Sequence, residues 1–170
     1  AIENVPNKYK NNQGLLYQRL QLKIKKDKID SALNLLLKAK SDKKNFNRPD
    51  KFWKPTSIII RRLVYKKKYL AAYKIASKHH LNEGSNYSEA EWLSGWIALS
   101  FLNNPELAIK HFLNMAKNAY DPKNRSRAAY WCGKTYETLG QQNLAESWYI
   151  KGSAYPTAYY GQLSFKKTFP

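Results

Sequence analysis

Apolar residues recur through most of this chain at spacings of three and four, the period of a helix that packs on one side. The clearest case is the segment 124–139, where Ala128 and Trp131 belong to such a stripe and Gly140 follows as a left-handed cap. No stretch alternates apolar and polar residues in the way a half-buried strand does. The pattern therefore predicts an all-α protein.

The predicted helices are arranged in pairs, with turn residues between them. The best turn signal is Asn104 followed by Pro105, which supplies an N-cap and a first-turn proline. The charged segment 41–52 has no periodicity, and we expect it to be a surface loop. The predicted pairs are 14–25 with 28–39, 54–65 with 69–80, 88–102 with 105–118, and 124–139 with 142–153, followed by a short helix at 158–165.

The helical pairs repeat along the sequence. The similar segments LAAYKIA, LAIKHFL and LAESWYI begin at residues 70, 107 and 144, which is a spacing of 37 residues. The preceding helices correspond as well, because WLSGW at 92–96 resembles YWCGK at 130–134. In both, a glycine lies among large aromatic residues, as expected where two helices approach closely. This period is typical of stacked helical repeats, so we expect an α-superhelix of antiparallel helix pairs similar to tetratricopeptide repeats.

Charge is unevenly distributed along the chain. Of 170 residues, 30 are Lys or Arg and 12 are Asp or Glu, and the net charge is +18. Residues 1–80 alone contain 21 basic and 5 acidic residues. This imbalance indicates either a polyanionic partner for the N-terminal half or the lysine-rich composition of an AT-rich genome, and charge alone does not separate the two.

The sequence contains no pattern that indicates catalysis, a metal or a cofactor. Glu91 is expected near the start of a helix, where a carboxylate complements the helix dipole. His79 and His80 are adjacent and diverge on a helix, and His111 stands alone, so packed or surface roles are expected for all three. The single cysteine, Cys132, is expected to be a buried packing thiol.

The remaining candidates are residues that could bind a ligand at the surface. Trp92, Trp131, Trp148 and Tyr149 lie at core spacing and are expected to pack. Aromatic residues outside the stripes are better candidates, although a flat ring stacks on a sugar or a nucleobase alike. The predicted binding residues are Trp53, Arg61, Arg62, Tyr155, Tyr159, Tyr160 and Gln162.

Several long motifs occur in a distinctive order. They are FWKPTSIIIRRLVYKKKYLAAYKIASKHH at 52–80, AEWLSGWIALSFLNNPELAIKHF at 90–112 and SRAAYWCGKTYETLGQQNLAESWYIKGSAYPTAYYGQL at 126–163. This series resembles the helical superdomain of the soluble lytic transglycosylases, which cleave the glycan strands of bacterial peptidoglycan. The resemblance covers residues 50–165 well and the first 45 loosely. Lys134 and Ser164 replace the Arg and Ala that are usual in the family.

The resemblance implies a non-catalytic scaffold in the periplasm that guides glycan strands. In the family, YYGQL leads into a lysozyme-like domain whose catalytic glutamate lies in a Glu-Ser motif, so we expect such a domain after Pro170 and no catalytic residue in this chain. The resemblance also implies N-terminal helices and a basic loop at 1–50, the repeat superdomain at 51–165, and the start of a connection at 166–170.

The expected partners are peptidoglycan strands and the chain's own catalytic domain, with no cofactor and no integral membrane segment. Two alternatives stay open on the sequence. One is a stand-alone helical-repeat module that binds peptidoglycan or a protein and lacks the enzyme domain. The other, less favoured, is a basic repeat protein that binds nucleic acid, whose affinity should fall steeply with salt.

Overall fold

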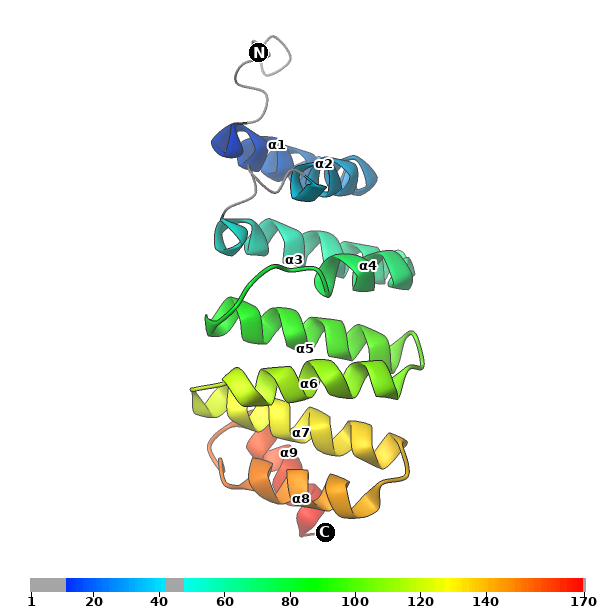
Figure 1. Cartoon of the computed structure of the whole chain (residues 1–170), viewed down its shortest axis with the longest axis vertical. Coiled ribbons are helices and arrows are strands. Elements are labelled where there is room, and N and C mark those ends of the chain that lie inside the picture. The colour runs from blue at the N-terminus through cyan, green and yellow to red at the C-terminus, as the bar shows by residue number, and fades with distance from the viewer. Residues whose placement is uncertain (1–11, 42–47, 170) are drawn as a thin grey trace. The chain divides into compact units, whose positions relative to one another are not determined.

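The computed structural model describes residues 12–41 and 48–169. Within these ranges the chain is all-helical and has no strand, which confirms the predicted class (Figure 1). None of the helices in these ranges has the length and hydrophobicity that crossing a membrane requires. The helices are α1 (Gln13–Lys25), α2 (Ile29–Ser41), α3 (Pro49–Tyr65), α4 (Tyr69–Ala76), α5 (Gly84–Ser100), α6 (Pro105–Asn118), α7 (Pro122–Thr138), α8 (Gln142–Ser153) and α9 (Tyr159–Thr168).

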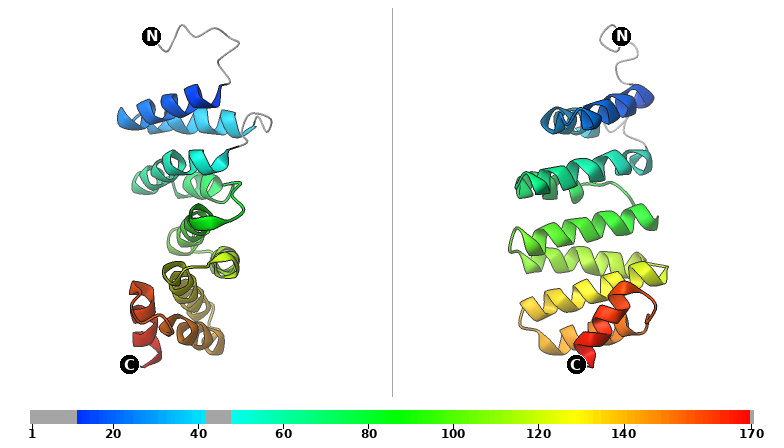
Figure 2. Two further views of the ribbon diagram at one scale, coloured as in Figure 1. Left: turned by 90° about the vertical axis from the view of Figure 1, so that its left-hand side faces the viewer. Right: turned by 180° about the vertical axis from the view of Figure 1, so that it is seen from behind.

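The chain forms two compact units, Ala1–Ile75 (unit 1) and Ala76–Pro170 (unit 2). In unit 1, α1 packs on α2, and both contact α3. In unit 2, α5 packs on α6 and α7 packs on α8, while α6 also contacts α7. Figure 2 shows α9 against α7 and α8, which it contacts. The boundary between the units lies within α4.

Two glycines in unit 2 mark the repeat, as predicted. A Cβ added to Gly95 in α5 would lie 2.6 Å from the ring of Phe112 in α6. A Cβ added to Gly133 in α7 would lie 2.7 Å from the ring of Tyr149 in α8. In both pairs, the bare backbone of the first helix lies against an aromatic ring of the second. The resemblance between the two sequence segments thus reflects the same helix–helix contact.

The register of the repeat differs by one residue from the sequence prediction. The similarity of LAAYKIA to LAIKHFL aligns Ala71 with Ala108, but in α4 Ala72 is fully buried while Ala71 is partly exposed. Burial depends on which face meets a neighbour, and a stretch of small residues leaves that choice open. The fully buried alanines of the second helix in each pair are Ala32, Ala72, Ala76, Ala108 and Ala145.

Three helix-pair turns are closed in the same way. Asp27, Lys67 and Gly140 have positive φ angles of 51°, 58° and 71°. The backbone N–H of the residue after each donates to a carbonyl five residues earlier, at 2.8–2.9 Å. This is the hydrogen bond of a Schellman motif, which satisfies the last carbonyls of a helix. The predicted left-handed cap at Gly140 is therefore confirmed.

The prediction of a loop at 41–52 is wrong for its last residues, because α3 begins at Pro49. Proline is favoured in a first helical turn, where its missing N–H has no partner to lose. Asp50 adds a negative charge at the same end, which complements the helix dipole. The part of the expected loop at 42–47 lies outside the described residues.

Candidate functional site

The strongest candidate for a binding surface is a group of half-buried aromatic rings on α5 and α7. Trp92 and Trp96 are one turn apart on α5, and their rings stack with centroids 5.8 Å apart at an interplanar angle of 9°. Trp131 of α7 meets Trp92 edge to face at 6.2 Å. All three are partly exposed, although their spacing also suits a core. The two helices therefore present a continuous indole surface.

Arg127 joins this surface to α9. Its guanidinium lies 4.9 Å from the ring centre of Trp92 and 5.6 Å from that of Tyr160. Tyr160 also contacts Tyr130 of α7, with ring centres 5.5 Å apart. A guanidinium between two ring faces is held by cation–π attraction and keeps its charge. We call Trp92, Trp96, Arg127, Tyr130, Trp131 and Tyr160 the aromatic face.

Three N–H groups of the aromatic face have no hydrogen-bond partner. They are Nε1 of Trp92, Nε1 of Trp131 and Nε of Arg127, and they are the only buried side-chain nitrogen or oxygen atoms without a partner in the part of the chain that the structure describes. Buried polar groups in folded proteins are nearly always paired. Three unpaired donors are therefore concentrated among rings that can stack on a ligand, and all three atoms are buried in this structure.

Four of the predicted binding residues lie near the C-terminus, and two of them are at this face. Tyr160 belongs to it, and Tyr159 contacts Tyr160 at 5.1 Å and is 69% exposed. Tyr155 is half-buried in the segment that leads to α9. Gln162 is exposed on α9, and its Nε2 donates to the carbonyl oxygen of Pro156 at 3.2 Å. The structure therefore places Tyr160 in the aromatic face, with Tyr159 in contact with it.

The other three predicted residues lie in unit 1. Arg61 and Arg62 are exposed on α3. Trp53 was expected to offer its ring at the surface, but only 3% of it is exposed. The reason is that α3 begins at Pro49, so Trp53 falls within the helix, next to Phe52 in its buried stripe. Trp53 is therefore not available to stack on a ligand in this structure.

Sequence reasoning missed the central residues of the aromatic face. Trp92 and Trp131 were expected to pack in the core, yet they are only half-buried, whereas the same expectation is correct for Tyr149, which is 3% exposed. The available signal was the i, i+4 spacing of Trp92 with Trp96 and of Arg127 with Trp131. That spacing defines a shared face without showing what covers it.

A second cluster in unit 2 surrounds Glu91, which is 5% exposed. Its Oε1 accepts from Nε2 of His79 at 3.3 Å, and its Oε2 accepts from Nδ1 of His111 at 2.5 Å. Nδ1 of His79 accepts from the N–H of Leu81 at 3.0 Å, so the proton of His79 is on Nε2. The expectation that Glu91 complements a helix dipole is wrong, because α5 begins at Gly84, two turns earlier.

The electrostatics of this cluster indicate a structural role. Burial alone would raise the pKa of Glu91, but the hydrogen bonds from His111 and His79 outweigh it and lower the pKa to about 2. Burial, together with the charge of Glu91 and a hydrogen bond to it, raises the pKa of Tyr87 to about 12. A general acid needs a pKa near the working pH, so a closed carboxylate of this kind is unsuited to proton transfer. The cluster instead joins α5 to α6 and to the segment after α4.

Two further features bear on reactive chemistry, the single cysteine and a Glu-Ser pair. Cys132 is buried as predicted, and burial raises the pKa of its thiol. In the described residues, no group of three or more His, Cys, Asp or Glu is placed to hold a metal ion. The chain has one Glu-Ser pair, Glu146 and Ser147, and both residues are exposed on α8, without the apolar enclosure that a catalytic acid requires.

Comparisons of this chain with models of protein families, with curated proteins and with solved structures gave no match.

Proposed function

We propose that this chain is the non-catalytic helical scaffold of a peptidoglycan lytic transglycosylase and that the aromatic face binds the glycan strand. The observation that carries the proposal is the group of three unpaired N–H donors among stacked rings on α5 and α7. Aromatic rings stack on the apolar faces of sugars, and N–H donors pair with hydroxyl and N-acetyl oxygens. The positive charge of Arg127 suits the carboxylates of the peptide stems.

The motifs at 52–80, 90–112 and 126–163 support the enzyme family in this proposal. By the same resemblance, the helix pairs stack as a superhelix similar to tetratricopeptide repeats, in the periplasm of a bacterium. The chemistry then belongs to a lysozyme-like domain that follows Pro170. The helix-on-helix packing and the equivalent glycine contacts at Gly95 and Gly133 are consistent with such a repeat.

Peptidoglycan binding is tested by sedimenting the purified chain with insoluble sacculi. Trp92→Phe keeps a ring but removes one donor, and we expect the affinity to fall about fivefold, the effect of one hydrogen bond. Arg127→Met removes the charge, and we expect about tenfold weaker binding. Tyr120→Ala is the control, because Tyr120 is 74% exposed in the same unit and makes no contact with the aromatic face.

Two results would contradict the proposal. The first is binding that is equally strong in wild type, Trp92→Phe and Arg127→Met, because the strand would then bind elsewhere. The second is release of soluble anhydro-sugar products by this chain alone, because the catalytic residues would then lie within it. If the native protein proves no longer than this chain, the alternative of a stand-alone binding module takes the place of an enzyme scaffold.

A further inference from the structure

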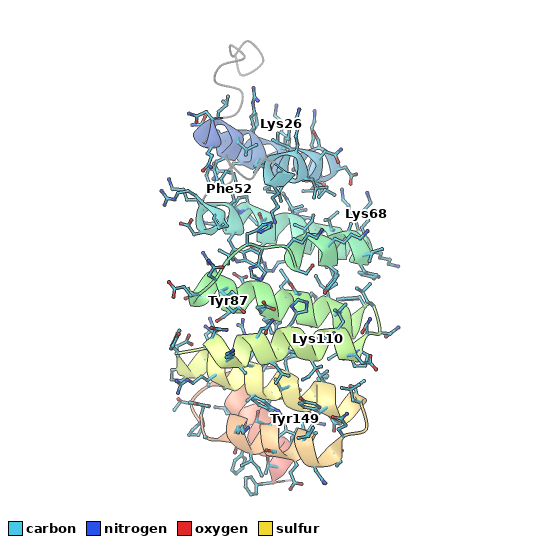
Figure 3. All side chains as sticks on the ribbon, viewed as in Figure 1. Lys26, Phe52, Lys68, Tyr87, Lys110 and Tyr149 are labelled. Carbon is cyan, nitrogen blue, oxygen red and sulfur yellow. The ribbon has the colours of Figure 1, made fainter. Side chains whose placement is uncertain are left out.

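Two lysine-rich turns lie side by side at one end of unit 1. The turn between α1 and α2 and the turn between α3 and α4 are joined by two ion pairs. Nη1 of Arg62 lies 3.4 Å from Oδ1 of Asp27, and Nζ of Lys68 lies 2.7 Å from Oδ1 of Asp30. Lys26 and Lys68, on the two turns, are labelled in Figure 3. The pairing holds the turns together as one surface.

This surface has a large excess of positive charge. Residues 23–30 and 61–68 contain nine Lys or Arg and two Asp, and both Asp are engaged by the ion pairs just described. Five other lysines are exposed, and no carboxylate in the described ranges lies within ion-pair distance of them: Lys25, Lys26, Lys28, Lys66 and Lys67.

Two apolar side chains project from the same surface. Tyr65 is 84% exposed and directly precedes Lys66, and Leu70 is 58% exposed and follows Lys68 by two residues. Folded proteins tend to cover large apolar side chains, so their exposure on both sides of a lysine run is informative. We call the five unpaired lysines with Tyr65 and Leu70 the basic end.

We propose that the basic end docks this protein on an anionic phospholipid surface. Lysines attract a negatively charged membrane surface, while a tyrosine ring and a leucine side chain are favoured at the boundary between headgroups and acyl chains. A nucleic acid would use the charge but gains nothing from Leu70. It is also bound best by arginine forks, whereas the five unpaired cations are all lysines. This inference does not rest on the proposed glycan binding, which uses unit 2.

The test measures sedimentation of the whole chain with vesicles of phosphatidylcholine that contain phosphatidylglycerol or lack it. We expect binding to the anionic vesicles only, weaker at high salt because exposed charges are screened. In Lys66→Gln/Lys67→Asn, affinity should fall about twentyfold, since each lysine near such a surface contributes about fivefold. Asn is chosen because Lys67 has a φ of +58°, which Asn tolerates.

A matched control removes two positive charges from unit 2. Lys110→Gln/Lys117→Gln on α6 should change vesicle affinity less than threefold, because only the basic end faces the membrane. Tyr65→Ala/Leu70→Ala should weaken vesicle binding. The binding that remains should be more sensitive to salt than that of wild type. Circular dichroism verifies that each variant is folded.

Three outcomes would overturn the proposal. One is the absence of binding to anionic vesicles at low salt, and another is an equal loss in the α6 control. The third is tighter binding to a duplex RNA or DNA in the same buffer, unaffected by Tyr65→Ala/Leu70→Ala, which would assign the basic end to nucleic acid. The aromatic-face variants Trp92→Phe and Arg127→Met should leave vesicle binding unchanged, so the two proposals fail separately.

Discussion

At the scale of single residues, Glu91 shows how a buried charge is kept in a helical protein. An isolated carboxylate in this place would be costly, but two imidazole N–H groups from His79 and His111 donate to it. The same two rings connect the segment after α4 with α6 through a residue of α5. Removing either partner would leave a buried charge without full compensation.

Glu91 should make the stability of this protein depend on acid. Its pKa falls from an ordinary 4.5 to about 2 on folding, so its contribution is complete above pH 4.5 and is lost as the pH falls towards 2. The shift corresponds to roughly 3 kcal/mol, of which about 2 kcal/mol is lost by pH 3. The free energy of unfolding in urea should therefore differ between pH 7 and pH 3 by about 2 kcal/mol less in Glu91→Gln than in wild type.

The matched variant for this measurement is Glu146→Gln, which changes an exposed glutamate on α8. It should unfold with the same pH dependence as wild type, because its carboxylate has no buried partner to lose. If Glu91→Gln and Glu146→Gln responded to pH alike, the imidazole pair would not be holding a charged Glu91.

At the scale of the elements, the repeat consists of a close approach between two helices. The ring of Tyr149 fills the space beside Gly133, and its hydroxyl donates to Oε2 of Glu137 at 2.9 Å. Lys167 of α9 donates to Oε1 of the same glutamate at 2.9 Å. Glu137 thus connects α7 to both α8 and α9, and the ring of Tyr149 is held in place.

Gly133→Ala should destabilise unit 2, although alanine is a better helix former than glycine. The gain in helix propensity is about 1 kcal/mol, whereas overpacking against the anchored ring costs about 1–3 kcal/mol. We therefore expect a net loss of about 1 kcal/mol in the free energy of unfolding, measured by urea unfolding. In a Tyr149→Leu background, the loss of unfolding free energy caused by Gly133→Ala should be smaller, because a flexible side chain can move aside. If Gly133→Ala instead raised the free energy of unfolding, the contact between Gly133 and Tyr149 would not be tight.

At the scale of the whole molecule, the two proposed activities belong to different units. The aromatic face lies entirely within Ala76–Pro170, and the basic end lies within Ala1–Ile75. Each unit has its own buried residues, including Phe112 and Met115 in one and Leu20 and Leu36 in the other. A chain that divides in this way can evolve or be studied as two parts.

The fragment Ala76–Pro170 should fold without the rest of the chain. We expect a cooperative thermal transition in its circular dichroism, because its five helices pack on one another. The fragment should keep sacculus binding and lose binding to anionic vesicles. A fragment without a cooperative transition would mean that unit 2 depends on unit 1 for its stability.

Most of the helices and the caps at Gly140 and Asn104 could be predicted from the sequence, because they follow from local preferences and from the spacing of apolar residues. The start of α3 at Pro49 was not predicted. Gly140 and Asn104 could be assigned in advance, since their turn chemistry acts within a few residues. The N–H of Leu107 donates to Oδ1 of Asn104 at 2.9 Å, as an N-cap requires. The pairing of glycine with aromatic rings was also visible as a repeated motif.

Which side chains are covered depends on how the helices pack in three dimensions. Trp53 precedes the helix predicted at 54–65 and Trp92 lies at core spacing, yet Trp53 is 3% exposed and Trp92 is half-buried beside a guanidinium. Glu91 and His111 are 20 residues apart, and no local pattern relates them. Burial and long-range hydrogen bonds depend on which helix packs against which face, and that arrangement arises from the sum of many weak contacts across the chain.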